Sequence, residues 1–360
     1  MKYKKKNLIG LFRLAVFSLI FMFLFAGLSN VFVPKGKNDA TGMSANITEA
    51  YKAEDKNTLD VAFIGNSDVY RAVNPVIIWE DLSITSCDIG MPRMSSYEAY
   101  RKLNNLFDVQ KPKLVVYEVD CMFSTVNHFD DKGDVDNNRH DNLDEAITKG
   151  INNLKDNFKN LDDAILSGIS YNFPLTKYKY RWKSIKAKDF INQKGKYHFF
   201  AKGFIYDKTA KPFLYGDTYL GENDGNKESF DRNADKYLEK TLQLCKKNNC
   251  QLLLISVPSG SSWNWQKHNA IVDFAEKNNI QFIDYNTNIE LLDNFDWNTD
   301  TKDQGNHLNA SGAAKVTKAI EKVLINDYHL TSSELTDEQT AKWKDDVKKY
   351  YKEIVKKKKK

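Results

Sequence analysis

A long apolar segment near the N-terminus constrains this chain more than any other feature. Residues Leu8–Val33 are almost wholly apolar, broken mainly by Arg13 and a few small polar residues. About 20 such residues are enough for a helix to cross a bilayer. Four lysines lie in Met1–Lys6, and a positive flank of this kind stays in the cytoplasm. The sequence therefore predicts a single transmembrane anchor that contacts membrane lipid through residues 7–33, with everything after Pro34 outside the cell.

A cleavable signal peptide is the alternative interpretation of this segment. Such a peptide has a short apolar region and an A-x-A-like cleavage site. Residues Ala26–Ser29 match that site poorly, so we expect an uncleaved anchor over residues 1–34. The following residues 35–57 are polar and short of apolar side chains, which is typical of a stalk. These features predict a single-pass protein of the cell membrane with a cytoplasmic N-terminus and an extracellular main domain.

The two ends of the chain hold much of its positive charge. The 360 residues have a formal net charge of +5, and residues 356–360 are an unbroken lysine run. Such a run is usually a solvated tail, although it could also contact anionic lipid headgroups or an anionic wall polymer. No nucleic-acid-binding motif accompanies the lysines, so we expect no nucleic-acid partner.

Cysteine usage argues against a domain built on disulfides or metal. The chain has 4 cysteines, Cys87, Cys121, Cys245 and Cys250, which is sparse for a disulfide framework. Buried free thiols are the favoured interpretation, and a bridge between Cys245 and Cys250 is the alternative. No C-x-x-C motif or clustered His/Cys spacing suggests zinc. We therefore expect neither a metal nor a cofactor.

Short apolar runs alternate with helical patterns after the stalk. The runs predicted as buried strands are Leu59–Ile64, Ile84–Ile89, Lys113–Val119, Gln251–Val257 and Ile280–Asp284. Helical spacing is found in Ser96–Phe107, Asp235–Cys245, Asn269–Lys277 and Ala310–Ile325. Strands that alternate with helices indicate a parallel sheet with helices on both faces. Catalytic groups then belong in the loops at the carboxyl ends of the strands.

One long stretch interrupts this alternation. Residues 124–232 contain no convincing buried strand and are too long for an ordinary crossover between strands. We expect them to form an inserted, mainly helical cap on a domain that spans residues 58–330. Residues 331–360 are predicted to form a basic C-terminal helix or tail.

A serine follows the first predicted strand at a turn. Ser67 comes directly after Gly65 and Asn66 and begins a predicted helix. At such a turn the hydroxyl is exposed at the sheet edge, where a substrate and a base can reach it. Backbone N–H groups at the turn can also hold a developing oxyanion. The alternative is that Ser67 only caps the helix, which serine does well.

An aspartate and a histidine lie together in the loop before the last predicted helix. Asp303 precedes His307 by four residues, and the sequence after them turns into the helix. A serine hydroxyl is a weak nucleophile that needs an adjacent base, and the base needs an orienting carboxylate. One loop at the carboxyl edge of the sheet can supply both. A single histidine in a polar loop is, however, more often inert.

The order of these motifs resembles the SGNH/GDSL hydrolases. It is closer to their membrane-anchored branch, which includes the D-alanyl-lipoteichoic-acid transfer protein and the polysaccharide O-acetylation proteins. The segments that carry the resemblance are Ile64–Pro75, Gly90, Lys111–Val116 and His307–Ala313. It covers residues 58–120 and 251–325, and it leaves the insert and both ends outside.

The resemblance implies a fold and a set of roles. The fold is a three-layer, flavodoxin-like α/β architecture with a parallel sheet. Ser67 would be the nucleophile, His307 the general base and Asp303 the residue that orients the imidazole. The backbone N–H groups of Ser67 and Gly90 would form part of the oxyanion hole.

Three departures from the family pattern affect these roles. Asn66 stands where the GDSL motif has aspartate. The family spacing is Asp-x-x-His, whereas this loop has one residue more between Asp303 and His307, so Asp300 remains an alternative orienting residue. Residues 118–120 replace the Gly-x-Asn-Asp block that supplies a side-chain oxyanion donor in free-standing esterases.

Aromatic residues suggest where a polymer would bind. In the insert, Tyr178 and Trp182 lie among lysines, and flat aromatic faces stack on sugar rings. The alternative is that these aromatics form the insert's own small core. After the fourth strand, Trp263 and Lys267 belong to the active-site edge and could contact the acyl group or simply pack beneath the cap.

Two functions fit these patterns. The first is a membrane-anchored, extracellular O-acyltransferase or esterase that acts on a cell-surface polysaccharide or teichoic-acid-like polymer through an acyl-serine. Because acyl donors are cytoplasmic, a multi-pass membrane-bound O-acyltransferase would be its partner. The second is a catalytically weak adaptor of the same fold that binds the glycopolymer and recruits that acyltransferase.

Overall fold

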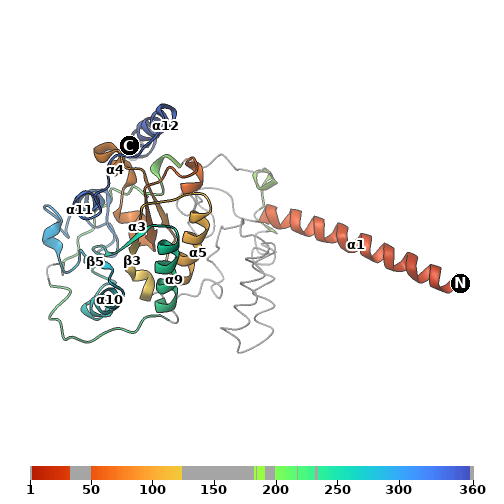
Figure 1. The fold of residues 1–360 in the computed structure, drawn as a ribbon, viewed down its shortest axis with the longest axis horizontal. Helices are drawn as coiled ribbons and strands as arrows, with labels where there is room; N and C mark the ends of the chain where they lie inside the picture. Colours follow the sequence, from red (N-terminus) through yellow and green to blue (C-terminus); the bar gives the residue numbers. More distant parts are fainter. Residues whose placement is uncertain are drawn as a thin grey trace. The chain divides into compact units, whose positions relative to one another are not determined.

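The computed structural model describes residues 2–32, 50–123, 182–183, 185–190, 199–216, 218–231 and 234–356 (Figure 1). The chain divides into two compact units. One comprises residues 1–44 with 128–196, and the other comprises residues 45–127 with 197–360. The described part of the first unit contains helix α1 (Lys2–Phe32) and a short 3-10 turn, η4 (Ala187–Phe190). Residues 35–49 of the predicted stalk and most of the predicted cap, including Tyr178, lie outside the described residues. Residues 50–57 are described, and Ala50 and Tyr51 are buried, so this end of the predicted stalk is part of the second unit.

A parallel sheet forms the centre of the second unit. Its strands are β1 (Val61–Gly65), β2 (Ser86–Gly90), β3 (Leu114–Glu118), β4 (Gln251–Ser256) and β5 (Gln281–Asp284). They pair in the order β2-β1-β3-β4-β5, with every neighbouring pair parallel. This is the flavodoxin-like order, in which ligands bind outside the carboxyl ends of the strands. The predicted α/β class with a parallel sheet is therefore confirmed.

Helices cover both faces of the sheet. The helices of this unit are α3 (Ser67–Ala72), α4 (Pro75–Leu82), α5 (Ser96–Phe107), α9 (Ala234–Lys247), α10 (Trp265–Asn278), α11 (Ala310–Asn326) and α12 (Asp337–Lys349). Short 3-10 turns are η1 (Ala50–Ala53), η2 (Val119–Phe123), η5 (Phe199–Ala201) and η6 (Ile289–Leu291), and a π-helix, η7 (Tyr350–Val355), follows α12.

The alternation of side chains along each strand explains the layers. Val61 and Phe63 of β1 join one buried cluster with Val316 and Ile320 of α11. The next residue along, Ala62, points to the opposite face because successive strand side chains alternate. On that face α5 and α9 pack together, one against β1 and the other against β4 (Figure 1). The core therefore lies in two apolar layers on either side of the sheet.

The last part of the predicted cap, residues 202–231, is not helical where the structure describes it. Residues 202–231, apart from Asp217, follow an irregular course over the carboxyl edge of the sheet. Backbone hydrogen bonds fix this course, from the N–H of Ile205 to the carbonyl of Tyr70 and from the N–H of Phe213 to the carbonyl of Trp297. This part of the predicted insert is not helical because its polar backbone pairs with loops of the sheet domain instead of with itself. Residues 124–181 and 191–198 of the insert lie outside the described residues.

The C-terminal segment packs on the domain through α12 and η7. Trp343 is buried and its ring lies 4.9 Å from the ring of Trp79. The Nζ of buried Lys202 lies 4.0 Å from the Trp343 ring centroid and 2.6 Å from a carboxylate oxygen of Asp346. These contacts make residues 331–356 part of the folded unit.

Over the residues that the structure describes, no helix meets both the length and the apolar character that a membrane crossing requires.

Candidate active site

The turn after β1 presents the Ser67 side chain. Asn66 has extended backbone angles and its Oδ1 accepts the N–H of Asp68 at 2.8 Å, so Asn66 is the N-cap of α3. Ser67 is the first helical residue and its hydroxyl takes no part in the cap. The alternative interpretation of Ser67 as a helix cap is therefore wrong, because its neighbour fills that position. The hydroxyl is left available for other contacts.

A tight loop before α11 holds the histidine. Thr301 and Leu308 form an isolated antiparallel bridge that closes the loop. At its tip Gln304 and Gly305 have φ of 61° and 88°, and a Cβ on Gly305 would lie only 2.6 Å from the Phe213 ring. The loop therefore requires glycine at its tip.

The turn brings Asp303 back onto His307. The Oδ1 of Asp303 accepts the backbone N–H of His307 at 2.7 Å, and its Oδ2 lies 2.7 Å from the His307 Nδ1. Two residues with left-handed backbone angles fit between them at the tip of the loop. The structure thus accommodates the extra residue relative to the family spacing within the turn itself.

These side chains form one continuous hydrogen-bonded chain. The Nε2 of His307 lies 2.8 Å from the Oγ of Ser67. Because an ionised Asp303 can only accept, the proton of the neutral imidazole belongs on Nδ1. The lone pair on Nε2 then faces the Ser67 hydroxyl, which is the tautomer that a general base for serine needs.

Asp303 is charged in these surroundings. Burial raises the pKa of Asp303, but the two hydrogen bonds and the charge of His307, with help from Lys302, outweigh burial and hold the pKa below its usual value. The Asp303 side chain keeps 32% of its exposure and that of His307 keeps 18%. A charged carboxylate can stabilise the imidazolium that forms when His307 takes a proton.

Asp300 lies elsewhere in the loop and does not contact the imidazole of His307. Its side chain is fully buried, and its Oδ2 lies 2.6 Å from the Nζ of Lys315 and accepts the N–H of Asp296 at 2.8 Å. Its backbone carbonyl accepts the N–H of Asn309, the residue that caps α11. The contacts of Asp300 are thus with the frame of the loop, and Asp303 is the aspartate that contacts the imidazole.

A buried acidic group lies on the other side of Ser67. The Nδ2 of Asn66 donates to Asp120 at 2.8 Å, and the Nζ of Lys267 donates to the other oxygen of Asp120 at 2.9 Å. Burial raises the pKa of Asp68 to about 7, opposed by His307 and reinforced by Asp120. Burial also raises the pKa of Glu118 well above its usual value, reinforced by Asp68 and Asp120. Residues 118–120 therefore build a salt-bridged support beneath the turn.

Gly90 lies against the turn that carries Ser67. It pairs with Gly65 at the ends of β2 and β1. A Cβ on Gly90 would lie 2.5 Å from the Tyr70 ring and 3.2 Å from the Asn66 carbonyl oxygen. Only glycine fits there, and this close approach places the Gly90 backbone next to the turn that carries Ser67.

The residues predicted to contact substrate have different surroundings. Trp263 is 4% exposed and its Nε1 donates to Asp284 at 2.9 Å, which makes it a packing residue. Lys267 is held by Asp120 and by the carbonyl of Ser262 at 2.7 Å. Trp182 is 65% exposed, with the Nζ of Lys183 5.3 Å from its ring centroid. Of these residues, Lys267 alone is linked to the nucleophile turn, through Asp120 and Asn66.

Sequence reasoning missed the support beneath the turn and the residues that surround it. The roles of Asn66, Asp68 and Glu118 depend on contacts between loops that are far apart in sequence. The available signal was the position of residues 118–120 at the carboxyl end of a strand that neighbours β1. Charged residues at such an end are expected near the site.

The described residues contain neither a disulfide nor a metal site. All four cysteines are free and buried, as favoured from the sequence. Within the described ranges, no group of three or more His, Cys, Asp or Glu side chains has an arrangement that could hold a metal ion.

No protein-family profile matches the chain, and no curated protein does. Among solved structures, the chain is similar to a Bacteroides fragilis protein classed as an acylhydrolase, with 12% identity and a TM-score of 0.36 over 81% of this chain and 99% of the other. It is also similar to a GDSL-like lipase from Bacteroides thetaiotaomicron, with 13% identity and a TM-score of 0.32 over 75% and 88%. The function of this chain has to be inferred from its own residues.

Proposed function

We propose that this chain is a serine esterase or O-acyltransferase of the SGNH/GDSL type. The observation that carries the proposal is the hydrogen-bonded chain from Ser67 through His307 to Asp303, with heavy-atom distances of 2.8 and 2.7 Å. Nucleophile, base and orienting carboxylate within hydrogen-bond reach form the arrangement that serine acyl transfer requires. Fold alone would not support this conclusion, because unrelated activities share the same fold.

The geometry supports a reaction in two halves. Ser67 Oγ attacks the acyl carbonyl while its proton passes to His307 Nε2, and the oxygen of the leaving alcohol then takes that proton as the old ester bond breaks. In the second half a hydroxyl gives its proton to His307 and attacks the acyl-serine. The bond between the acyl carbon and Ser67 Oγ then breaks, and His307 returns the proton to Ser67 Oγ. Water as the attacking group makes an esterase, and a sugar hydroxyl makes an acyltransferase. The backbone N–H groups of Ser67 and Gly90 would stabilise the oxyanion in both halves.

The proposed acceptor is a cell-surface polysaccharide or teichoic-acid-like polymer. Two features support this setting: the basic residues before an apolar segment, and the exposed apolar side chains along α1, among them Phe12 at 70% and Phe23 at 81% exposure. Burying such side chains in lipid is favourable. We propose that residues 7–33 anchor the protein in the cell membrane with the site outside, and that a multi-pass membrane-bound O-acyltransferase hands over the acyl group.

Labelling with a fluorophosphonate tests the proposed nucleophile. The probe forms a stable bond only with an activated serine, so the wild-type protein should be labelled and Ser67→Ala should not. Ser311→Ala is the matched control, because Ser311 is an exposed serine just after His307 at the start of α11 and should leave labelling intact. Mass spectrometry of the tryptic peptides locates the label.

A second readout concerns the polymer. Cells that express normal levels of Ser67→Ala should lose the acyl groups of the surface polymer. Unlabelled wild-type protein together with unchanged acylation in Ser67→Ala cells would contradict catalysis and favour the adaptor.

A further inference from the structure

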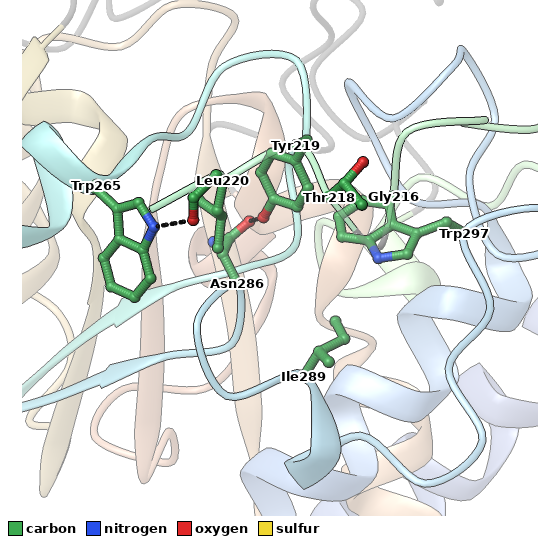
Figure 2. A pocket seen from close by; sticks show the side chains of 9 residues that line it. Gly216, Thr218, Tyr219, Leu220, Trp265, Asn286, Ile289 and Trp297 are labelled. Carbon is green, nitrogen blue, oxygen red and sulfur yellow. Dashed lines mark hydrogen bonds between the residues drawn. The ribbon is translucent and has the colours of Figure 1, made fainter. Parts of the chain in front are cut away.

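An aromatic-lined pocket lies at the same edge of the sheet as the reaction centre. It encloses about 490 Å³, within the range of small-molecule sites. Its main lining side chains are Tyr219, Leu220, Trp265, Asn286, Ile289 and Trp297. Figure 2 shows Trp265 and Trp297 on opposite sides of the space, with Tyr219 and Asn286 between them. The walls come from three segments, which are the irregular stretch 202–231, the start of α10 and the loops that follow β5.

The walls are rigid because their polar groups are satisfied within the protein. The Oδ1 of Asn286 accepts from the Tyr219 hydroxyl at 2.7 Å and from the Ser259 N–H at 2.9 Å. The Nε1 of Trp265 donates to the carbonyl of Gly221 at 3.0 Å. Trp297 is 5% exposed and packs edge-on against Tyr219 at 5.2 Å between ring centroids. The flat faces are therefore held in place before any ligand arrives, which lowers the entropic cost of binding.

The chemistry of the lining selects a class of ligand. None of the described residues that line the pocket is charged. Aromatic faces suit a molecule with apolar C–H faces, and the uncharged lining offers no counter-charge for a phosphate or a carboxylate. A neutral sugar ring has both properties.

The pocket is connected to the loop of His307 but lies several strands away from Ser67. Ser259 joins the two places, since its N–H contacts Asn286 and its Oγ donates to the carbonyl of Asn306 at 2.9 Å, next to His307. Ser67 follows β1 and the pocket lies after β4 and β5, so three strand spacings, roughly 14 Å, separate the nucleophile from β5. A sugar in the pocket is therefore too far away to be the one that reacts.

We infer that this pocket holds a neutral sugar ring of the acceptor glycan, one or more units away from the unit that is acylated. The inference rests on the proposed function, because it names where the acceptor chain is gripped. It also makes Trp265 a residue that determines which polymer is used.

Calorimetric titration tests the inference without any turnover. The probes are cellohexaose, maltohexaose and the hexamer of N-acetylglucosamine, with hexagalacturonate as the charged comparison. At least one neutral hexamer should bind the full-length protein, and Trp265→Ala should weaken that binding roughly tenfold by removing a stacking face. Trp265→Phe should recover part of the affinity. Tyr351→Ala, which removes an exposed aromatic ring that does not line the pocket, is the matched control and should bind like the wild type.

Three outcomes would overturn the inference. They are no binding of any neutral hexamer, equal binding of hexagalacturonate, or unchanged affinity in Trp265→Ala with an unchanged melting temperature. Since binding is measured directly, failure of Ser67 to react with a fluorophosphonate would contradict the proposed function and leave this result standing.

Discussion

The carboxylates around Ser67 fall into two regions with different surroundings. Asp303 lies on a loop, a third exposed, and receives two hydrogen bonds from His307. Asp68 and Glu118 lie beneath the turn, almost fully buried, and an oxygen of Glu118 has no hydrogen-bond partner among the described residues. The same chemical group is therefore held charged in one region and pushed toward its neutral form in the other.

The difference shows how carboxylates around one turn can have separate roles, with a charged one beside His307 and buried ones that stabilise the turn. A charged carboxylate is useful where an imidazolium forms, and donors and partial solvent access keep Asp303 charged there. Beneath the turn, Lys267 can balance one negative charge through Asp120, and burial opposes any further charge on Asp68 and Glu118. We expect the loop carboxylate to control turnover and the buried group to control stability.

The largest expected effect is on turnover, in Asp303→Asn. An amide at this position can donate to Nδ1 and stabilise the wrong tautomer of His307, which removes the lone pair that faces Ser67. Turnover of a small ester such as p-nitrophenyl acetate should fall roughly 10⁴-fold, with little change in melting temperature. Steady-state kinetics at neutral pH measure this. A loss of less than tenfold would show that His307 does not depend on Asp303.

How far the sequence predicts this site depends on the range of the contacts. The strands and the turn after β1 were predictable because short apolar runs and a following glycine are local signals. Ser67, His307 and Asp303 were predictable because the chemistry needs those residue types at the carboxyl edge of a parallel sheet. The structure moves the strand ends by only a few residues.

Features that depend on distant contacts were not predictable in this way. The choice between Asp303 and Asp300 is decided by a turn at Gln304 and Gly305 that directs only one side chain to the imidazole. Docking of α12 depends on Trp343 meeting Trp79 across a long sequence separation. The aromatic pocket joins three separate segments, so no single stretch of sequence reveals it.

The second expected effect is on the pH dependence of stability, in Asp68→Asn. Burial raises the pKa of Asp68 to about 7 from an ordinary value near 3.8. A raised carboxyl pKa means that the unfolded state loses its proton first, so Asp68 stabilises the fold at low pH relative to neutral pH. That contribution is lost as the pH rises from about 4 to 7, by up to a few kcal/mol. The variant should lack this loss.

Denaturant unfolding of both proteins at pH 4.5 and pH 7.5 measures the difference. Asp68→Asn should gain stability relative to the wild type between the two values, while Asp303→Asn, which removes a carboxyl with a lowered pKa, should show no such gain. Parallel behaviour of Asp68→Asn and the wild type would mean that Asp68 is not held in a buried environment.

The third expected effect separates the two aspartates of the loop. Asp300→Asn removes the charge that Lys315 pairs with, at a side chain that is fully buried, and should cost roughly 1–3 kcal/mol of unfolding free energy. Since Asp300 does not contact the imidazole, the folded protein should keep turnover within about tenfold of the wild type. Unfolding and ester kinetics on the same samples test both parts, and a turnover loss equal to that of Asp303→Asn would move the orienting role to Asp300.

The smallest expected effect is a difference in unfolding free energy between variants of two neighbouring residues, the helix cap Asn66 and the proposed nucleophile Ser67. Asn66 caps α3 and also donates to Asp120, so Asn66→Ala should cost about 1–2 kcal/mol of unfolding free energy. The Ser67 hydroxyl has neither role, and Ser67→Ala should change stability by about 0.5 kcal/mol or less. Chemical denaturation resolves this difference. If Ser67→Ala cost as much as Asn66→Ala, the hydroxyl would be part of the helix cap in solution, and its place in the hydrogen-bonded chain with His307 would no longer explain why a serine is needed at this turn.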